Sequence, residues 1–327
     1  MTAVAIGGYF GWEHDAGVGL EWLRRASRYQ SARCAIVALL RAVRPRRIWA
    51  PNYICGAVND ALLASGTHVK RYPLSSTWGV SSDIDMESGD WMFCVDYFGI
   101  SRFEVEAALD RFGSQCVLVD ASQSLFYRPR AEESVIYSPR KFAGVPDGGL
   151  LIAGVDLPLP READEGDSRG RCAHLLSRAE GRVEEGYRQF LSAEESLNNC
   201  EPVAMSALTA KAIDKLNAQG ISRQRVANYE LLASQLSLHG MNVPSLPHEA
   251  VPLCCPVSHL NASRMRKELA ARGVYTPAYW PDAVVPADDP YGLMLRDATL
   301  FLPCDQRYGA PEMTQVVSSL LQIKDPP

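Results

Sequence analysis

Several features that mark particular classes of protein are missing from this chain of 327 residues. None of its nine cysteines lies in a CxxC pair and its six histidines stand singly, so no zinc or other metal site is expected. No apolar run reaches the roughly 20 residues that cross a bilayer, and the N-terminus lacks the basic start of a signal peptide. We therefore expect a cytoplasmic protein with reduced cysteines and no membrane partner.

The chain also lacks a strong excess of either charge. Its 33 Lys and Arg residues against 38 Asp and Glu residues give a formal net charge of −5, which does not favour a nucleic-acid partner. No internal repeat, low-complexity tract or Gly/Ser-rich linker divides it. With 47% hydrophobic residues, it can bury the cores of one large domain and one smaller domain.

The first half contains alternating helical and strand-like segments. Apolar residues at helical spacing predict helices over 30–43, 56–65 and 102–112. Short apolar runs predict strands over 47–50, 69–72, 91–95, 116–119, 134–137 and 149–152. Continuous apolar strands that alternate with helices are typical of a mostly parallel sheet sandwiched by helices, so the predicted fold class is α/β. In such sheets, ligands bind beyond the carboxyl ends of the strands.

The second half is richer in helices. The charged stretch 161–171 is predicted as an exposed loop, followed by helices over 172–192 and 205–238, the latter interrupted at Gly220. From about residue 242 the pattern indicates a smaller α+β unit, with strands over 251–257 and 274–278 and helices over 262–272 and 311–323. We therefore predict a large domain over residues 1–210 and a small C-terminal domain over residues 211–327.

An acidic residue and a lysine follow two of the predicted strands. Asp120 ends one buried strand, and Lys141 comes just after the next, before a glycine-rich turn at 144–149. Alone, such an Asp is commonly a helix cap and such a Lys a solvated surface residue. Together they are the pair that pyridoxal 5'-phosphate (PLP) needs: an amine for a Schiff base and proton transfer, and a carboxylate that keeps the pyridine nitrogen protonated. The ordered pair, with Gln123 and Pro139 beside it, predicts a PLP site with Lys141 as the catalytic residue.

Three segments resemble motifs of the DegT/StrS-type family of PLP-dependent nucleotide-sugar aminotransferases. They stand in the family's order as Asp120-Ala121-Ser122-Gln123, Pro139-Arg140-Lys141 and Pro146-Asp147-Gly148-Gly149. Other segments are similar to a little-characterised branch of that family, namely Gly7-Gly8-Tyr9-Phe10, Tyr137 to Phe142 and Asp305-Gln306-Arg307-Tyr308. The resemblance covers nearly the whole chain. It implies fold type I of the PLP-dependent transferases and a homodimer with the site at the subunit interface.

The resemblance also implies roles around the cofactor. Asp120 would hold the pyridinium and Gln123 would hydrogen-bond the ring hydroxyl, with Ser122 beside them in the same motif. The segment Ser31-Ala32-Arg33 stands where the family has its phosphate loop at the start of a helix. The candidates for holding the phosphate and for forming the wall of the ring site are Ala32, Arg33, Ser138 and Tyr53.

Three residues nearer the C-terminus are candidates for the substrate. Arg307 can bind a carboxylate with two hydrogen bonds, or it forms a structural salt bridge with Asp305 or a neighbour. Tyr279 and Trp280 stand where the family shapes the substrate mouth, or they pack the small domain. The sequence leaves both pairs of alternatives open.

The chain departs from the family at two places that bear on the phosphate. Ile136 replaces a serine that the family has five residues before the lysine. The stretch 202–206, Pro-Val-Ala-Met-Ser, lacks the Asn and Arg with which the family reaches across its dimer to the cofactor. The resemblance therefore implies a rebuilt or lost contact between subunits.

These observations predict a PLP-dependent aminotransferase that moves an amino group from glutamate to a keto group of a nucleotide-linked sugar. Two alternatives stay open. A lyase or dehydratase would use the same electron sink, although the family's dehydratases replace the lysine by histidine. A non-catalytic member that binds PLP or a nucleotide sugar would fit the missing Asn and Arg, but fits the intact Asp120 and Lys141 less well.

Overall fold

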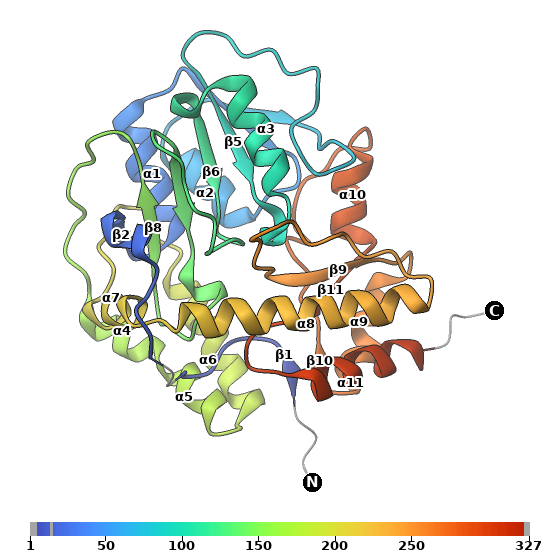
Figure 1. Cartoon of the computed structure of the whole chain (residues 1–327). Coiled ribbons are helices and arrows are strands. Elements are labelled where there is room, and N and C mark those ends of the chain that lie inside the picture. Colours follow the sequence, from blue (N-terminus) through green and yellow to red (C-terminus); the bar gives the residue numbers. More distant parts are fainter. Residues whose placement is uncertain (1–4, 14–15, 324–327) are drawn as a thin grey trace.

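The computed structural model describes residues 5–13 and 16–323. A seven-stranded sheet forms the centre of the larger part of the molecule (Figure 1). Its strand order is β2 (Ser27–Tyr29), β8 (Gly149–Ile152), β7 (Ser134–Tyr137), β6 (Val117–Asp120), β5 (Asp90–Val95), β3 (Arg47–Pro51) and β4 (Val69–Tyr72). The pairs from β7 to β4 are parallel, and only the β2–β8 and β8–β7 pairs of this sheet are antiparallel. The prediction of an α/β fold with a mostly parallel sheet is thus confirmed.

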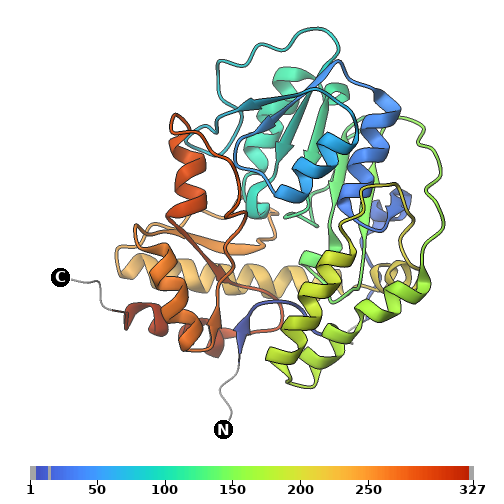
Figure 2. The same ribbon diagram turned by 180° about the vertical axis from the view of Figure 1, so that it is seen from behind.

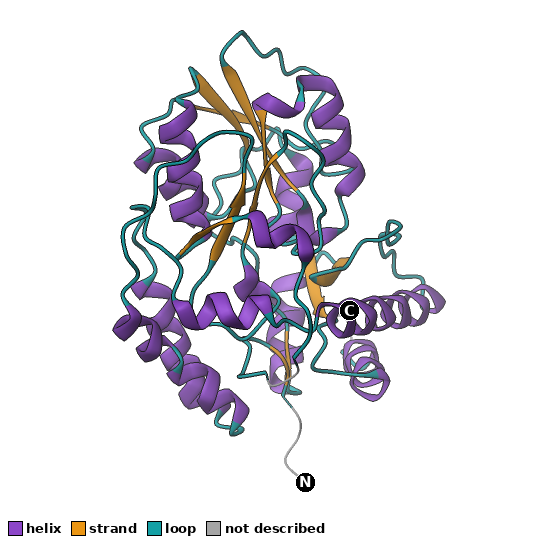
Figure 3. Cartoon of the chain, turned by 60° about the vertical axis from the view of Figure 1, so that its left-hand side comes forward, coloured by secondary structure: helices purple, strands orange, loops and turns teal. Residues whose placement is uncertain are grey.

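Helices cover both faces of this sheet. Helix α3 (Arg102–Phe112) lies on one face, and α1 (Ala32–Val43) and α2 (Gly56–Ala64) lie on the other (Figures 1 and 2). A view from the side shows the sheet between these layers (Figure 3). Because both faces are covered, every residue of β6, β7 and β8 is buried, which is why these strands are continuous apolar runs.

Helix α1 shows how the sequence sets the start and end of an element near the ligand edge. The Ser31 hydroxyl accepts a hydrogen bond from the Cys34 backbone N–H at 3.3 Å, as an N-cap residue does. The helix ends where Arg44 adopts a left-handed conformation with φ 46°, just before Pro45. Seven consecutive residues from Cys34 to Leu40 are buried, because α1 packs between the sheet and α2.

The middle of the chain differs from the sequence-based prediction. The stretch 161–171 was predicted as an exposed loop, but it contains α4 (Glu165–Arg171), whose Ser168 and Arg171 are buried. The predicted helix over 172–192 is broken at Gly181 into α5 (Ala173–Ala179) and α6 (Val183–Ser196), which pack side by side.

The long helix over 205–238 is also two helices, but its break does not lie at Gly220. Helix α7 (Ala207–Asp214) ends before α8 (Ala218–Leu238) begins. Gly220 lies in the first turn of α8, where its N–H donates to the side chain of the N-cap residue Asn217 at 3.0 Å. This position needs no intrahelical partner, so the glycine is tolerated. Helix α8 runs below the sheet toward the C-terminal part (Figure 1).

The C-terminal part is a smaller α+β unit with its own core. Its antiparallel strands β9 (Cys254–Ser258) and β11 (Thr299–Pro303) pack against α8, α9 (Ala262–Ala271) and α11 (Ala310–Leu321). The sequence did not predict β11 or α10 (Pro290–Asp297), and the strand expected over 274–278 is only β10 (Val274–Tyr275). The N-terminal strand β1 (Ile6–Gly7) pairs with β10, and Ile6 belongs to this second core.

Four short 3-10 helices complete the described chain: η1 (Glu21–Arg25), η2 (Tyr97–Gly99), η3 (Ser114–Cys116) and η4 (Pro139–Lys141). Two of them, η2 and η4, follow strands β5 and β7 directly and carry site residues. Within residues 5–13 and 16–323, no helix is long and apolar enough to span a membrane.

Candidate active site

Asp120 and Lys141 meet at the carboxyl ends of two neighbouring strands. β6 ends at Asp120, which pairs with Ile136 of β7, and Lys141 ends the η4 turn that follows β7. The Asp120 carboxylate is buried and accepts a hydrogen bond from the Ser122 N–H at 2.8 Å. Burial raises the pKa of Asp120 above its ordinary value, although the charge of Lys141 opposes this. A buried carboxyl group with a raised pKa binds a proton tightly, including a proton that it shares with a hydrogen-bond partner.

Lys141 is half-buried, and its amine is left free by the rest of the chain. Its backbone N–H donates to the Ser138 carbonyl at 3.3 Å, which closes the η4 turn. In the described part of the chain, its side chain has no hydrogen bond and no ion pair. Its Nζ lies 6.0 Å from the centroid of the Trp280 ring, and its charge acts on the Asp120 carboxyl group. An uncommitted amine at the ligand edge of the sheet is available for bonding to a ligand.

Gln123 contributes an unsatisfied donor to the same edge. Its Oε1 accepts a hydrogen bond from the Phe98 N–H at 2.9 Å, but its buried Nε2 has no partner among the described residues. A buried amide N–H without an acceptor costs about 1–3 kcal/mol, so such groups normally meet a ligand or water. A carboxylate, an amine and an amide N–H are the kinds of group that can meet a pyridinium nitrogen, an aldehyde and a hydroxyl, so the chemistry of this set suits a ligand such as PLP.

Aromatic rings surround this set. Phe98 has the left-handed φ of 58° inside η2, which turns the chain sharply after β5. The ring of Tyr53 lies 5.9 Å from that of Tyr97 and 4.9 Å from that of Trp280, measured between centroids. The Tyr53 hydroxyl donates to the carbonyl of Tyr279 at 2.9 Å. Three predicted residues, Tyr53, Tyr279 and Trp280, are therefore brought together, and Trp280 faces Lys141.

The phosphate candidates lie around Gly148 and Gly149, which separate the α1 N-terminus from the Lys141 turn. The backbone of Gly148 pairs with Ser31 on one side, and an added Cβ atom would lie 2.9 Å from Cγ of Pro139 on the other. Arg33, at the start of α1, donates from Nη1 to Oδ1 of Asn198 at 2.9 Å. Ser138 forms no capping hydrogen bond through its side chain, so this hydroxyl is not committed to η4.

Arg140 is a neighbour of Lys141 that the sequence analysis did not single out. It is largely shielded from solvent and forms an ion pair with Glu194 of α6. Burial lowers the pKa of Arg140 to about 10, and the positive charge of Arg33 contributes to the shift. The only sequence signal was a second basic residue next to the lysine, which usually marks a solvated surface.

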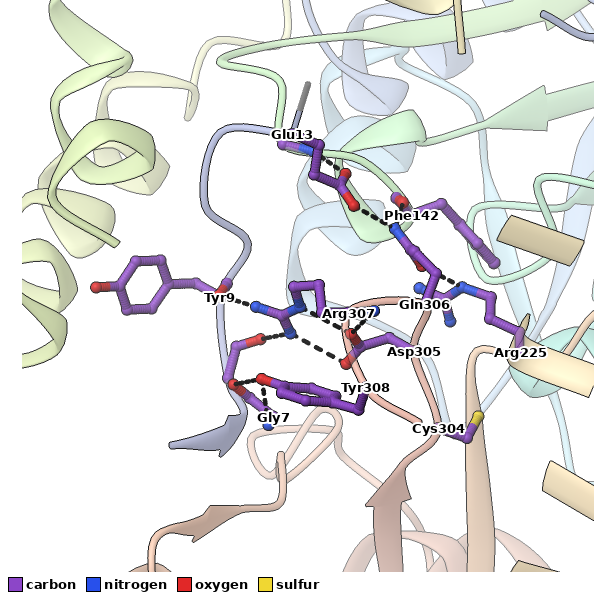
Figure 4. A network of polar contacts seen from close by, with 12 residues as sticks. Gly7, Tyr9, Glu13, Phe142, Arg225, Cys304, Asp305, Gln306, Arg307 and Tyr308 are labelled. Atoms are coloured by element: carbon purple, nitrogen blue, oxygen red, sulfur yellow. Dashed lines mark hydrogen bonds and ion pairs between the residues drawn. The ribbon is translucent and has the colours of Figure 1, made fainter. Parts of the chain in front are cut away.

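Arg307 is engaged within the chain. Its Nε and Nη2 donate to the Asp305 carboxylate at 2.7 and 3.0 Å, and its Nη1 and Nη2 donate to the carbonyls of Tyr9 and Gly8 (Figure 4). These contacts are those of the salt-bridge alternative, and they tie the segment after β11 to the N-terminal segment. A carboxylate-binding role for Arg307 stays a prediction.

No protein-family model matches the sequence, and no curated protein is similar to it in sequence. The fold, however, is shared with solved aminotransferases. The aminotransferase TlmJ from Streptoalloteichus hindustanus superposes with a TM-score of 0.66 at 13% identity, over 96% of this chain and 97% of that one. PseC from Helicobacter pylori, an aminotransferase involved in the biosynthesis of pseudoaminic acid, gives 0.62 at 12% identity over 98% and 92%. DesV from S. venezuelae gives 0.59 at 18% identity over 92% and 85%.

At these low identities the likeness concerns the fold. The chain has the α/β fold of these aminotransferases over almost its whole length, which confirms the predicted fold class.

Proposed function

We propose that this protein is a PLP-dependent aminotransferase that moves an amino group from glutamate to a keto group of a nucleotide-linked sugar. The observation that carries the proposal is the convergence of Asp120, Gln123 and Lys141 at the carboxyl ends of β6 and β7. When bound, PLP supplies an electron sink that stabilises negative charge on the carbon next to the transferred nitrogen.

The residues of this chain supply the binding and the proton transfers. The Lys141 amine would anchor the cofactor aldehyde and, once released, would take a proton at Nζ and return it. The Asp120 carboxylate would keep the ring nitrogen protonated, for which its burial is suited because a desolvated charge pair is strong. Gln123 would donate its unpartnered Nε2 hydrogen to the ring oxygen.

The phosphate would lie at the N-terminus of α1. The first N–H groups of a helix point outward, and the helix dipole favours an anion there. Arg33 adds a guanidinium at the second residue of α1, and Ser138 adds a hydroxyl from the start of the Lys141 turn. These two side chains would offset the missing serine at Ile136.

The substrate class rests on the fold comparison. Solved structures with this fold include a sugar aminotransferase, CalS13 from Micromonospora echinospora, with a TM-score of 0.60 at 13% identity. The proposal also includes a nucleotide-linked keto sugar as the acceptor, a homodimeric assembly and a cytoplasmic location.

Absorbance spectroscopy of the purified protein tests the proposal. With PLP, the wild type should show a visible band that moves to shorter wavelength when glutamate is added. Lys141→Ala should not form the band, whereas Lys211→Ala, at an exposed lysine of α7, should behave as the wild type. A wild-type protein that shows no band after addition of PLP would overturn the proposal, and a band in Lys141→Ala would overturn the assignment of the lysine.

A further inference from the structure

Gln306 joins three distant parts of the chain at one amide group. It lies in the segment between β11 and α11. Its Oε1 accepts a hydrogen bond from Nε of Arg225 at 2.8 Å. Its Nε2 donates to the carbonyl of Phe142 at 2.7 Å and to Oε1 of Glu13 at 2.8 Å (Figure 4). The N-terminal segment, helix α8 and the turn that carries Lys141 thus meet at this side chain.

The chemistry of these partners fixes the amide in one orientation. A guanidinium offers only donors, whereas a carboxylate and a carbonyl offer only acceptors. Turning the amide over would place its NH₂ group against Arg225 and its oxygen against Glu13 and the Phe142 carbonyl. A side chain at 306 must therefore present an acceptor on one side and two donors on the other, which Asn and Gln alone provide through an amide.

The residues that follow Lys141 contact each member of this network. Phe142 is fully buried, and the Arg225 guanidinium carbon lies 4.6 Å from the centroid of its ring. The Gly144 N–H donates to Oε2 of Glu13 at 3.1 Å. A Cβ atom on Gly144 would lie only 1.9 Å from the carbonyl oxygen of Gly11, so the N-terminal segment packs directly onto this turn.

If stability were its only role, this buried polar network would be an unfavourable way to gain it. Arg225 is fully buried, its Nη1 donates only to the carbonyls of Pro252 and Leu253, and its Nη2 has no hydrogen-bond partner among the described residues. The hydrogen-bond acceptors of this guanidinium are uncharged, and the nearby charges of Asp305 and Glu13 offset only part of its desolvation, so burial lowers the pKa of Arg225. Packed apolar groups commonly stabilise a fold as well as such a buried charge or better. What the polar network adds is a fixed geometry for the Lys141 turn.

Lys141 depends on that geometry. Within residues 5–13 and 16–323 its side chain makes no hydrogen bond or ion pair, so its direction follows from its backbone and from packing against Trp280. We propose that Gln306 is a positioning residue for Lys141. It holds the turn that carries Lys141 through its hydrogen bond to Phe142, while Arg225 and Glu13 hold the Gln306 amide in place. This inference rests on the proposed Schiff-base role of Lys141.

The test measures how fast Lys141 forms its bond with PLP. The protein is mixed with PLP, the product is reduced with borohydride at set times, and the modified lysine is located and quantified by peptide mass spectrometry. Gln306→Leu keeps the approximate size but removes both donors and the acceptor. We expect it to fold and to modify Lys141 at least tenfold more slowly, whereas Gln322→Leu, at an exposed glutamine, should match the wild type.

Gln306→Glu gives a second readout that a merely structural role would not produce. The introduced carboxyl group keeps an acceptor for Arg225 but faces Glu13, with the charges of Asp305 and Arg307 nearby. At neutral pH the two carboxylates should repel and slow the modification of Lys141. As the pH falls, a proton shared between them restores one donor, so the defect relative to the wild type should shrink.

The outcomes separate this inference from the proposed function. If the wild type forms no bond with PLP at all, the proposed function fails. If it does, and Gln306→Leu modifies Lys141 at the wild-type rate, the positioning role is overturned. If Gln306→Leu does not fold, the same test uses Glu13→Ala, which changes a half-exposed position. We expect Glu13→Ala to slow the modification of Lys141 about threefold. A folded Glu13→Ala with the wild-type rate would then overturn the inference.

Discussion

The amine of Lys141 and the indole ring of Trp280 face each other, with Nζ 6.0 Å from the ring centroid. The lysine follows β7 of the large sheet, and the tryptophan comes from the segment between β10 and α10. Trp280 is buried and has a left-handed φ of 52°, a conformation that costs a non-glycine residue about 1–2 kcal/mol. The packing of its ring against Tyr53 and Tyr97 must offset this cost.

Removal of the indole ring should both weaken the fold and expose Lys141. We expect Trp280→Ala to lower the free energy of unfolding by about 3–5 kcal/mol, as for other buried aromatic side chains. It should also speed acetylation of Lys141 by acetic anhydride, followed by mass spectrometry under conditions where the variant stays folded. Trp280→Phe, which keeps a ring, should show smaller changes in both. Equal acetylation rates in all three proteins would show that the indole does not shield the lysine.

Asp289 should be a second point where the two units depend on each other. It is fully buried and accepts hydrogen bonds from Nδ2 of Asn52 at 3.0 Å, the Leu74 N–H at 3.3 Å and the Gly292 N–H at 2.8 Å. Asp289→Asn turns one acceptor oxygen into a donor that faces other donors. We expect it to cost about 1–3 kcal/mol in urea unfolding, while Asp288→Asn, on the exposed neighbour, stays within about 0.5 kcal/mol.

A double-mutant cycle would test whether Asn52 is the partner through which Asp289 stabilises the fold. If the Asn52–Asp289 bond is as close as its distance indicates, Asn52→Ala and Asp289→Asn should be less than additive by at least about 0.5 kcal/mol. Fully additive losses would mean that Asp289 acts only through the two backbone N–H groups.

The sequence predicted the central sheet well because burial on both faces leaves a strong local signal. It missed α4 for the opposite reason. The segment Glu165–Arg171 has no apolar side chain and two glycines, and it is held by the Asp164 cap and by Arg171, whose Nε donates to Ser196 at 2.7 Å. Such a tertiary contact leaves no periodicity in the sequence.

The residues of the candidate site also fall into two groups, those that the sequence predicted and those that it did not. Asp120, Gln123 and Lys141 were predictable because each lies within four residues of a strand end and the chemistry needs that order. Gln306 and Glu13 were not predicted as site residues, since they reach Phe142 and Gly144 across 164 and 131 residues of sequence. The sequence showed Gln306 only as part of a motif, and no local pattern reveals which carbonyl an amide will meet. Arg140 was missed because only the fold buries it.

Gly149 should be essential to the predicted phosphate end of the site. A Cβ atom there would lie 2.1 Å from the carbonyl carbon of Ser31 and 2.4 Å from the N atom of Ala32. Because both are backbone atoms, Gly149→Ala must displace the start of α1. We expect a loss of about 1–3 kcal/mol in stability and a roughly tenfold weaker affinity for PLP, with the affinity for pyridoxal, which lacks the phosphate, nearly unchanged.

Gly154→Ala is the matched control, since its nearest neighbour would be 3.7 Å away. It should leave both affinities unchanged. An equal loss of PLP and pyridoxal binding in Gly149→Ala would place the phosphate elsewhere.

His174 should make the stability of the protein fall in mild acid. Its ring is buried edge-on against the stacked rings of Tyr9 and Phe190, with centroid distances of 6.0 and 5.6 Å, and its Nδ1 has no hydrogen-bond partner among the described residues. Burial, and then the positive charge of Arg140, lower the pKa of His174 from 6.5 to about 4. Between these two values the unfolded chain binds a proton that the folded chain does not, so stability is lost as the pH falls through this range.

From pH 7 to pH 5, this group should remove about 1–2 kcal/mol from the free energy of unfolding. His174→Phe cannot be protonated and keeps an aromatic ring against Tyr9 and Phe190, so its stability should decline less over the same range. Urea unfolding at pH 7, 6 and 5 measures the difference, with His239→Gln, at an exposed histidine, as the control that follows the wild type. If His174→Phe loses as much stability as the wild type, the acid sensitivity arises from the carboxylates, and His174 is already protonated or solvated in the folded protein.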